Sequence, residues 1–306
     1  MTMTYHDEHL LDRAAMLALR GLIALQPESG LGPEARPGFD ALIEKTPAAH
    51  GVTYEAAEVG VVGWWCRPGD AVAGAAILYL HGGAYVVGSA AAYRNFAGQI
   101  AARAKAATFV AGYALAPERP FPIAFDDAKA AYRAVAAAGF TRITIAGDSA
   151  GGGLALAVLA AVATEARLGT LPAPSAAAVM SPWIDLALTG DSMDAKASAD
   201  PLLTRTSLAA AAHLYLGGHD PRDPRVSALH GDFTDLPPVL LHVGEDEVLL
   251  DDARRYAAAA EAAGISAELH VWQGMVHVFP ANLALLRAAP EALDSLADFL
   301  RRHSAA

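Results

Sequence analysis

Residues 143–159, with the sequence ITIAGDSAGGGLALAVL, place a serine inside a Gly-x-Ser-x-Gly motif. Ser149 follows an apolar run with β-strand character and precedes a long apolar run with helical character. A sharp turn from strand to helix leaves no room for side chains two residues before and after its serine, and Gly147 and Gly151 occupy those positions. A serine in such a turn lies at a helix N-terminus, whose free N–H groups favour developing negative charge. The motif therefore predicts that Ser149 is a nucleophile.

The same glycines have two other interpretations, a phosphate-binding loop and an ordinary tight turn. A P-loop needs Gly-Lys followed by Ser or Thr, and this segment has no such triplet. The glycines at 147, 151, 152 and 153 also do not follow the Gly-x-Gly-x-x-Gly spacing of dinucleotide sites. The order strand, turn, helix favours the nucleophile.

A serine hydroxyl is a weak nucleophile at neutral pH, so a histidine base and a carboxylate that orients it are expected downstream. In the α/β-hydrolase fold the chain order is serine, acid, histidine. The segment PPVLLHVGEDEVLLDD at 237–252 predicts a strand followed by an acidic loop that contains Asp246. The segment AELHVWQGMVHVFP at 267–280 predicts a last strand followed by a loop that contains His277. We predict Asp246 as the acid and His277 as the base.

Other residues of the same types compete for these two roles. The acidic alternatives are Glu245, Glu247, Asp251 and Asp252, of which the last two are expected in the first turn of the next helix, where carboxylates are favoured for structural reasons. The other histidines are expected to be structural or to lie far from the serine. They are His242 and His270 in predicted strands, His213, His219 and His230 in an insertion, and His6, His9, His50 and His303 elsewhere.

A negatively charged tetrahedral intermediate needs N–H donors, and the loss of one donor costs about 3–4 kcal/mol. The segment AAILYLHGGAYVVGS at 75–89 predicts a strand that ends at His81-Gly82-Gly83-Ala84, where glycines let backbone N–H groups approach a ligand closely. We predict an oxyanion hole formed by Gly82, Gly83 or Ala84 together with the N–H of Ala150. His81 is expected to brace the loop by hydrogen bonding, and an ordinary flexible turn is the alternative interpretation.

Charge and hydropathy limit the classes of function. With 22 Lys and Arg against 33 Asp and Glu, the chain has a formal net charge of −11 and no basic run, which disfavours nucleic acid. A chain that is 54% hydrophobic and 18% charged is expected to be globular rather than disordered. The longest apolar run, 154–164, is too short for a membrane span, and the acidic start MTMTYHDEHL differs from a basic export signal. Because Cys66 is the one cysteine, we expect no internal disulfide and a reducing, cytoplasmic location.

Eight short apolar or alternating runs predict the strands that position these residues. They lie at 52–59, 61–67, 75–80, 108–113, 142–146, 176–180, 239–243 and 267–272, with helix-length segments at 92–105, 125–138, 151–167, 252–264 and 290–303. This alternation predicts an α/β fold with a mostly parallel sheet of about eight strands, helices on both faces and an antiparallel hairpin at one edge. We expect residues 1–306 to form one domain, in which 1–50 and 184–235 form a helical lid over the carboxyl ends of the strands.

Several motifs together resemble the hormone-sensitive-lipase-like bacterial esterases of the α/β-hydrolase superfamily. They are HGGAYVVGS, YALAPERPFPIAFDD, GDSAGGGLA, SPWIDL, DPLLT, DEVLLDD and GMVHVF. Within the family, these motifs most resemble those of short-chain carboxylesterases and monoterpene lactone hydrolases. The resemblance implies a carboxylesterase with a lid and with Ser149, Asp246 and His277 as its triad. Ala84 departs from the family's usual third glycine; its N–H can still donate, but its methyl group restricts the loop.

We therefore expect a serine carboxylesterase that hydrolyses small to medium neutral esters, or lactones, through an acyl-enzyme. An amidase, lactonase or acyltransferase on the same triad is one alternative, and a non-catalytic ligand-binding relative is another. No cofactor or metal is expected, because HDEH at 6–9 lacks the His-Glu-x-x-His pattern. The expected partner is a small ester, with no nucleic acid or membrane, and a homodimer is predicted through the last strand and the last helix at the open sheet edge. The candidates for the substrate pocket are Tyr85, Trp183, Leu202, Val248 and Phe279.

Overall fold

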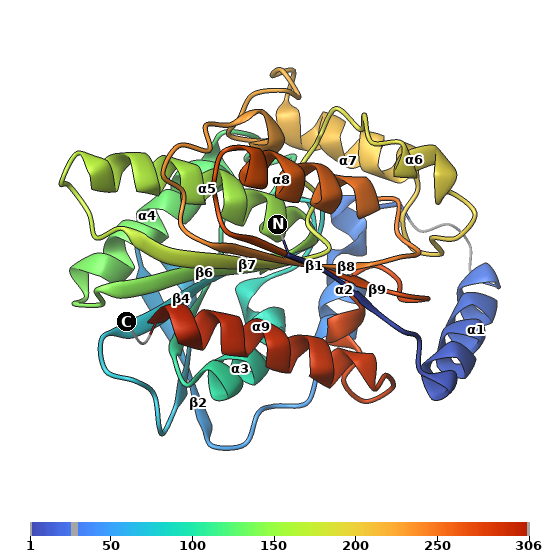
Figure 1. The fold of residues 1–306 in the computed structure, drawn as a ribbon, viewed down its shortest axis with the longest axis horizontal. Helices are drawn as coiled ribbons and strands as arrows, with labels where there is room; N and C mark the ends of the chain where they lie inside the picture. The colour runs from blue at the N-terminus through green and yellow to red at the C-terminus, as the bar shows by residue number, and fades with distance from the viewer. Residues whose placement is uncertain (1, 26–29, 305–306) are drawn as a thin grey trace.

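A nine-stranded sheet runs through the centre of the molecule, with helices on both of its faces (Figure 1). The computed structural model describes residues 2–25 and 30–304 of the chain. The strand order is β1-β9-β8-β7-β6-β4-β5-β3-β2. Neighbouring strands from β1 to β5 in this order are parallel, whereas β3 is antiparallel to both β5 and β2. The α/β fold predicted from the sequence is confirmed.

All eight predicted strands are present, with ends within two residues of those expected. The central strands β4, β5 and β8 are buried along their whole length, which explains why they read as continuous apolar runs. The predicted edge hairpin is formed by β2 and β3, which turn at Gly60 with a φ of +72°. The bounds are β2 Val52–Val59, β3 Val61–Pro68, β4 Ala75–Leu80, β5 Ala107–Ala111, β6 Arg142–Asp148, β7 Pro174–Met180, β8 Val239–Gly244 and β9 Ala267–Trp272.

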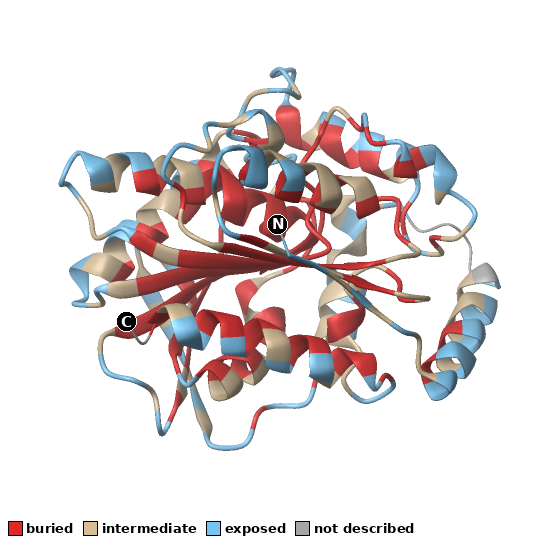
Figure 2. Cartoon of the chain, viewed as in Figure 1, coloured by how far each residue is buried: buried red, intermediate tan, exposed pale blue. Residues whose placement is uncertain are grey.

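Two layers of helices cover the sheet and bury different sides of each strand. On β4, Leu78 and Leu80 point into the larger core cluster, whereas Ile77 and Tyr79 point into a second cluster on the opposite face. Figure 2 shows the buried strands as a red band between the two layers. The larger cluster is covered by α4 Ile123–Ala137, α5 Ser149–Arg167 and α8 Leu250–Ala262, and the second by α3 Ala90–Ala104 and α9 Ala288–Ser304.

Helix α5 is apolar on nearly all sides because it lies inside the core. By length and composition it could cross a membrane, but 72% of its most apolar window is buried inside the protein. A helix that is apolar all round is expected in the core of a protein of this size. Since α5 begins at Ser149, its packing fixes the position of the serine.

The first segment of the chain departs from the prediction, because it begins with a strand of the sheet. Strand β1, Thr2–His6, pairs in parallel with β9 and raises the number of strands from the expected eight to nine. Residues 2–6 therefore belong to the sheet rather than to the predicted lid, and residues 1 and 26–29 of that lid lie outside the described residues. Because β9 pairs with β8 on one side and β1 on the other, the expectation of an open sheet edge at β9 is wrong, whereas the homodimer itself stays a prediction.

The rest of the two predicted lid segments is partly helical. Residues before 50 form α1 Leu10–Ala24, η1 Pro33–Ala35 and α2 Arg36–Ile43, and the insertion forms α6 Ser192–Ala195, α7 Arg205–Leu216 and η2 Ala228–His230. In Figure 1, α6 and α7 lie on the α8 side of the sheet and α1 lies beyond its end. The Arg20 guanidinium on α1 donates to Ala199 O, and Arg36 Nε on α2 donates to Val86 O at 2.8 Å. These bonds tie the N-terminal segment to the insertion and to the loop after β4.

Candidate active site

Ser149 lies in a strained turn between β6 and α5. Its φ of +51° is in the left-handed region, which a serine rarely adopts and which often marks functional sites. The neighbouring glycines are sterically required, because a Cβ at Gly147 would lie 2.5 Å from Gly151 O and a Cβ at Gly151 would lie 2.1 Å from Leu80 O. The predicted strand, turn and helix around the serine are therefore present.

His277 approaches Ser149 from the loop after β9. Its Nε2 atom lies 2.9 Å from Ser149 Oγ, the distance of a hydrogen bond from the hydroxyl to a neutral imidazole. The histidine side chain is 11% exposed and the serine 9%, so the pair is shielded but within reach of a small molecule. The structure thus brings together the serine and the histidine singled out in the sequence.

The acid predicted at Asp246 is corrected by the structure to the next residue. Glu247 Oε2 lies 3.0 Å from His277 Nδ1, and the Glu247 side chain is fully buried. Its other oxygen, Oε1, accepts hydrogen bonds from Gly244 N at 2.6 Å and from Ser181 Oγ at 2.7 Å. Both carboxylate oxygens are therefore held in place, with Oε2 directed at the imidazole.

Asp246 points away from the histidine because two cations attract it. Arg20 Nη2 donates to its Oδ2 at 2.8 Å, and Lys196 Nζ lies 3.8 Å from its Oδ1. The Asp246 side chain remains 28% exposed, unlike that of Glu247. One sequence signal favoured Glu247, since it directly precedes the apolar run 248–250 and a residue in that position is expected to turn inward.

The surroundings of His277 favour its charged form. Burial by itself lowers its pKa, but the hydrogen bond with Glu247 and the negative charges of Glu247, Asp200 and Asp148 outweigh burial and raise the pKa above its ordinary value of 6.5. A higher pKa makes the neutral imidazole a stronger base. A reaction that needs the neutral imidazole therefore accelerates as pH rises through that pKa.

The loop after β4 packs on the first turn of α5 and supplies candidate oxyanion donors. Gly82 N donates to Asp148 Oδ1 at 3.0 Å, so the prediction that this N–H faces a ligand is wrong. Gly83 and Ala84 follow with φ values of +115° and +52°. Their N–H groups remain candidates, together with that of Ala150, which lies in the first turn of α5 where helix N–H groups lack helical partners.

Comparison with known proteins identifies the family. Residues 77–281 match the family model of the α/β hydrolase fold. An acetyl-hydrolase from Streptomyces hygroscopicus is 42% identical over 239 residues, 78% of each chain, and an esterase from Acinetobacter venetianus is 34% identical over 285 residues, 92% of this chain and 93% of the other. A crystal structure of an esterase from the bacterial hormone-sensitive lipase family matches with a TM-score of 0.87 and 37% identity, over 96% of this chain and 97% of that one. The chain belongs to the hormone-sensitive-lipase-like esterases.

In this hormone-sensitive-lipase-like esterase, a buried carboxylate anchors the loop that carries the oxyanion candidates. Asp148 accepts hydrogen bonds from Tyr79 Oη at 2.7 Å, Gly82 N at 3.0 Å and Tyr93 Oη at 3.1 Å. His81 braces the same loop, as predicted, because its Nδ1 lies 2.7 Å from Gly82 O. Burial lowers the pKa of His81 to about 4, so its ring is neutral at pH 7 and acts in the fold rather than as a base.

Replacing Asp148 by Asn tests this anchor through the pH dependence of stability. Burial raises the pKa of Asp148 from 3.8 to about 6, against the opposing effect of its three hydrogen bonds. The folded protein therefore binds the proton more tightly than the unfolded chain, and the stability from this group is complete below about pH 4 and lost as pH rises through about 6. We expect the difference in unfolding free energy between wild type and Asp148→Asn, measured in urea, to fall by roughly 2.5 kcal/mol from pH 4 to 7.

Asp252 is a matched control for this measurement. Burial raises its pKa to about 7, and its carboxylate accepts hydrogen bonds from Ile184 N and Asp185 N rather than from the oxyanion loop. The difference in unfolding free energy between wild type and Asp252→Asn should therefore continue to fall up to about pH 7. The loop after β4 should keep its structure in this variant, because Asp252 makes its hydrogen bonds elsewhere. A pH-independent difference for Asp148→Asn would contradict the tight binding of its proton in the folded state.

Of the five predicted pocket residues of this esterase, Trp183 lies beside Ser149, and Tyr85 lies near Trp183. Trp183 N donates to Ser149 O at 2.9 Å, and Trp183 is fully buried. Tyr85 follows the oxyanion loop, also fully buried, and its ring centroid lies 6.2 Å from that of Trp183 and 3.8 Å from that of Tyr215 on α7. This aromatic cluster joins the loop after β4 to the lid insertion.

The other three predicted pocket residues are placed differently. Leu202 is 46% exposed in the insertion. Val248 is buried, and its N–H donates to Asp200 Oδ2 at 3.0 Å. Phe279 packs against Trp272 at a centroid distance of 5.4 Å, in a core cluster separate from the one that contains Tyr85 and Trp183. Phe279 is fully buried there, and its pocket role stays a prediction.

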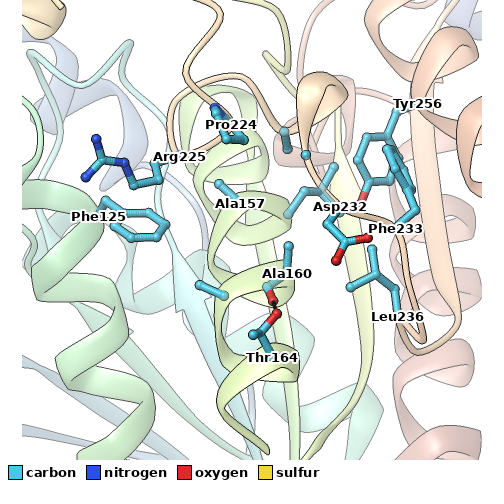
Figure 3. Close-up of a pocket in the computed structure, with 14 residues that line it drawn as sticks. Phe125, Ala157, Ala160, Thr164, Pro224, Arg225, Asp232, Phe233, Leu236 and Tyr256 are labelled. Atoms are coloured by element: carbon cyan, nitrogen blue, oxygen red, sulfur yellow. Dashed lines mark hydrogen bonds between the residues drawn. The ribbon is translucent and has the colours of Figure 1, made fainter. Parts of the chain in front are cut away.

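A hollow of about 190 Å³ opens on the outer side of α5, between α4 and α8 (Figure 3). Its lining includes Phe125 of α4, Ala157 and Thr164 of α5, and Phe233 and Tyr256 on the α8 side. Ser149, Glu247 and His277 are not among the residues that line it. The hollow of this esterase is thus separate from the cluster of Ser149, His277 and Glu247.

Proposed function

We propose that the chain is a serine carboxylesterase that hydrolyses small to medium neutral esters through an acyl-enzyme on Ser149. The observation that carries the proposal is a continuous chain of contacts through the His277 ring. Its Nε2 atom lies 2.9 Å from Ser149 Oγ, and its Nδ1 atom lies 3.0 Å from Glu247 Oε2. A nucleophile, a base and an orienting acid at hydrogen-bond distance are the arrangement that acyl transfer requires. The names of the relatives, an acetyl-hydrolase and an esterase, support the same activity.

Acylation begins when Ser149 Oγ attacks the ester carbonyl carbon. His277 Nε2 takes the hydroxyl proton, and the Nδ1–H donates to Glu247, which holds the tautomer and stabilises the imidazolium. The carbonyl oxygen becomes an oxyanion, for which we propose the N–H groups of Gly83, Ala84 and Ala150 as donors. His277 then returns its proton to the alkoxide oxygen, the C–O bond breaks and the alcohol leaves.

Deacylation repeats these steps with water. His277 Nε2 removes a proton from water as its oxygen attacks the acyl carbon, and the same N–H groups stabilise the second oxyanion. When this intermediate collapses, the imidazolium protonates Ser149 Oγ, the acid is released and the free serine is restored. Every proton moves through His277, so the cycle uses this chain's own residues and water.

The charge around the site favours neutral substrates. The carboxylates of Glu247, Asp148 and Asp200 are buried, and all three act electrostatically on His277. An anionic acyl group would meet their negative field in a medium of low dielectric constant. We also propose that residues 7–25, 30–50 and 184–235 form the lid, since Arg20 connects α1 both to Ala199 of the insertion and to the loop of the acid.

Covalent labelling and an ester panel test the proposed function. A fluorophosphonate should modify the wild type at Ser149, as located by peptide mass spectrometry, and should not modify Ser149→Ala. Short-chain p-nitrophenyl esters should be hydrolysed, whereas an ester with a carboxylate on its acyl chain should react more slowly than its neutral analogue of equal length. Absence of both labelling and hydrolysis would favour the non-catalytic ligand-binding alternative.

Amidase, lactonase and acyltransferase activities use the same centre, so a matched panel separates them. An ester, a lactone and an anilide with the same acyl group should be compared by kcat/KM, with an added alcohol to detect acyl transfer. The proposal expects the ester and water to be the preferred pair. The cytoplasmic location and the homodimer remain predictions, the latter by a surface other than β9.

A further inference from the structure

A second serine touches both loops of the catalytic centre. Ser181 lies directly after β7, is fully buried, and donates from its Oγ to Glu247 Oε1 at 2.7 Å. The same oxygen accepts a hydrogen bond from Val278 N, the residue after the catalytic histidine, at 3.0 Å. One hydroxyl therefore bridges the acid and the loop of the base.

Both ends of this bridge are conformationally strained. Val278 has a φ of +49° and Ser181 a φ of +46°. For a β-branched residue such as valine, a positive φ is a genuine outlier, and strain of this kind persists only where the surroundings hold it. The Ser181 backbone is held by the hydrogen bond from its N–H to His242 O at 2.7 Å, and its side chain in turn holds the N–H of Val278.

The position of Ser181 also decides which way the carboxylate faces. Glu247 Oε1 accepts from Ser181 Oγ and Gly244 N, which leaves Oε2 for the Nδ1 atom of His277. A glutamate has one more rotatable bond than an aspartate, so its carboxylate needs more fixed partners to hold one orientation. Ser181 supplies one of these partners from a separate strand of the sheet.

We infer that Ser181 is a positioning residue for the reaction: it sets the orientation of the Glu247 carboxylate and the strained turn that aims the His277 ring. The inference rests on the proposed function, because it assigns Ser181 a role through that acid and that base. Without the hydroxyl, Glu247 Oε1 still accepts from Gly244 N, which keeps the carboxylate near the imidazole. The carboxylate nevertheless loses a donor that stabilises its negative charge, so it attracts the imidazolium more strongly. The kinetic pKa of His277 should therefore rise.

Ser181→Ala and Ser192→Ala form a matched pair. Ser192 is also buried, and its Oγ also makes two hydrogen bonds, to Val248 O at 2.6 Å and from Asp251 N at 3.0 Å, but it touches neither Glu247 nor the histidine loop. With p-nitrophenyl butyrate, Ser181→Ala should lower kcat about 10- to 100-fold with KM within about threefold, and should move the acid limb of the kcat/KM profile to higher pH. Ser192→Ala should keep the wild-type profile and a kcat within about threefold of wild type.

A second variant keeps the test independent of folding. Ser181→Gly also removes the hydroxyl, but glycine adopts a φ of +46° without steric strain, so its backbone is at least as well accommodated. The same loss of kcat and the same shift of the acid limb are expected in this variant, with an unfolding transition close to that of wild type. A wild-type kcat and pH profile in folded Ser181→Gly would overturn the inference.

The outcomes also separate this inference from the proposed function. If Ser149→Ala and Glu247→Gln are inactive while Ser181→Gly matches wild type, the triad stands and the role of Ser181 falls. If equal losses occur in Ser181→Ala and Ser192→Ala, without a shift of either pH profile, Ser181 contributes only to the fold. If Ser149→Ala keeps full activity, the proposed function itself is wrong.

Discussion

Ser149→Ala is expected to reduce ester hydrolysis by roughly 10⁴- to 10⁶-fold, because the acyl-enzyme can no longer form. Alanine keeps the Cβ of the serine and lacks only the hydroxyl, whose contact is with His277 Nε2, so the fold should be unaffected. Steady-state hydrolysis of p-nitrophenyl butyrate, corrected for the buffer rate, measures the loss, and circular dichroism confirms that the variant is folded.

The double variant Ser149→Ala/His277→Ala provides the control. Residues that act as one unit show strongly non-additive effects, since removal of the nucleophile makes the base useless. The double variant should therefore be no less active than Ser149→Ala alone. Losses that multiply would mean that the serine and the histidine act independently, in contradiction to their 2.9 Å contact.

Glu247→Gln is expected to lower kcat by roughly 10³- to 10⁴-fold, whereas Asp246→Asn should change it by less than about threefold. The glutamine keeps the size of the glutamate but lacks the charge that stabilises the imidazolium, and it can present an N–H to His277 Nδ1 and so favour the wrong tautomer. Asp246→Asn loses only a partly exposed ion pair with Arg20 and Lys196. Kinetics of both variants on one ester decides between the adjacent residues.

Each variant is the isosteric control for the other, because both replace a carboxylate by an amide in the same loop. A large loss in Asp246→Asn with normal activity in Glu247→Gln would restore the acid predicted from the sequence and reject the one in contact with the histidine. Large losses in both would show that the loop acts as a unit, with the Arg20 ion pair needed to hold Glu247 in place.

The sequence predicts the fold and the strained turn at Ser149 well because both depend on local pattern. Continuous apolar runs mark strands buried on both faces, and the elbow requires glycines at fixed offsets from Ser149. The predicted edge hairpin and the position of His277 after the last strand follow from the same kind of signal. Strand β1 was missed because five residues without a strong apolar face give a weak pattern, and their partner lies at the far end of the chain.

The acid was misplaced because Glu245, Asp246 and Glu247 are three neighbouring carboxylates, and only the direction of each side chain in the fold shows which one reaches His277. That direction is set by contacts from distant residues: Asp246 turns toward Arg20, 226 positions earlier, and Glu247 toward Ser181 and His277. Gly82 was misassigned for a similar reason, since its N–H is occupied by Asp148. No local pattern reports such pairings.

The pairing of β1 with β9 has a consequence for synthesis of the chain. Thr2 is the first residue of the ladder and lies opposite Glu268, so strand β1 leaves the ribosome long before its partner β9. Before β9 has been made, the backbone N–H and C=O groups of β1 have no partner strand and can bond to water or to other chains. Unpaired strands of this kind are prone to mispairing and aggregation. This end of the sheet, and the helix α1 that follows it, can reach their final arrangement only after β9 has been made.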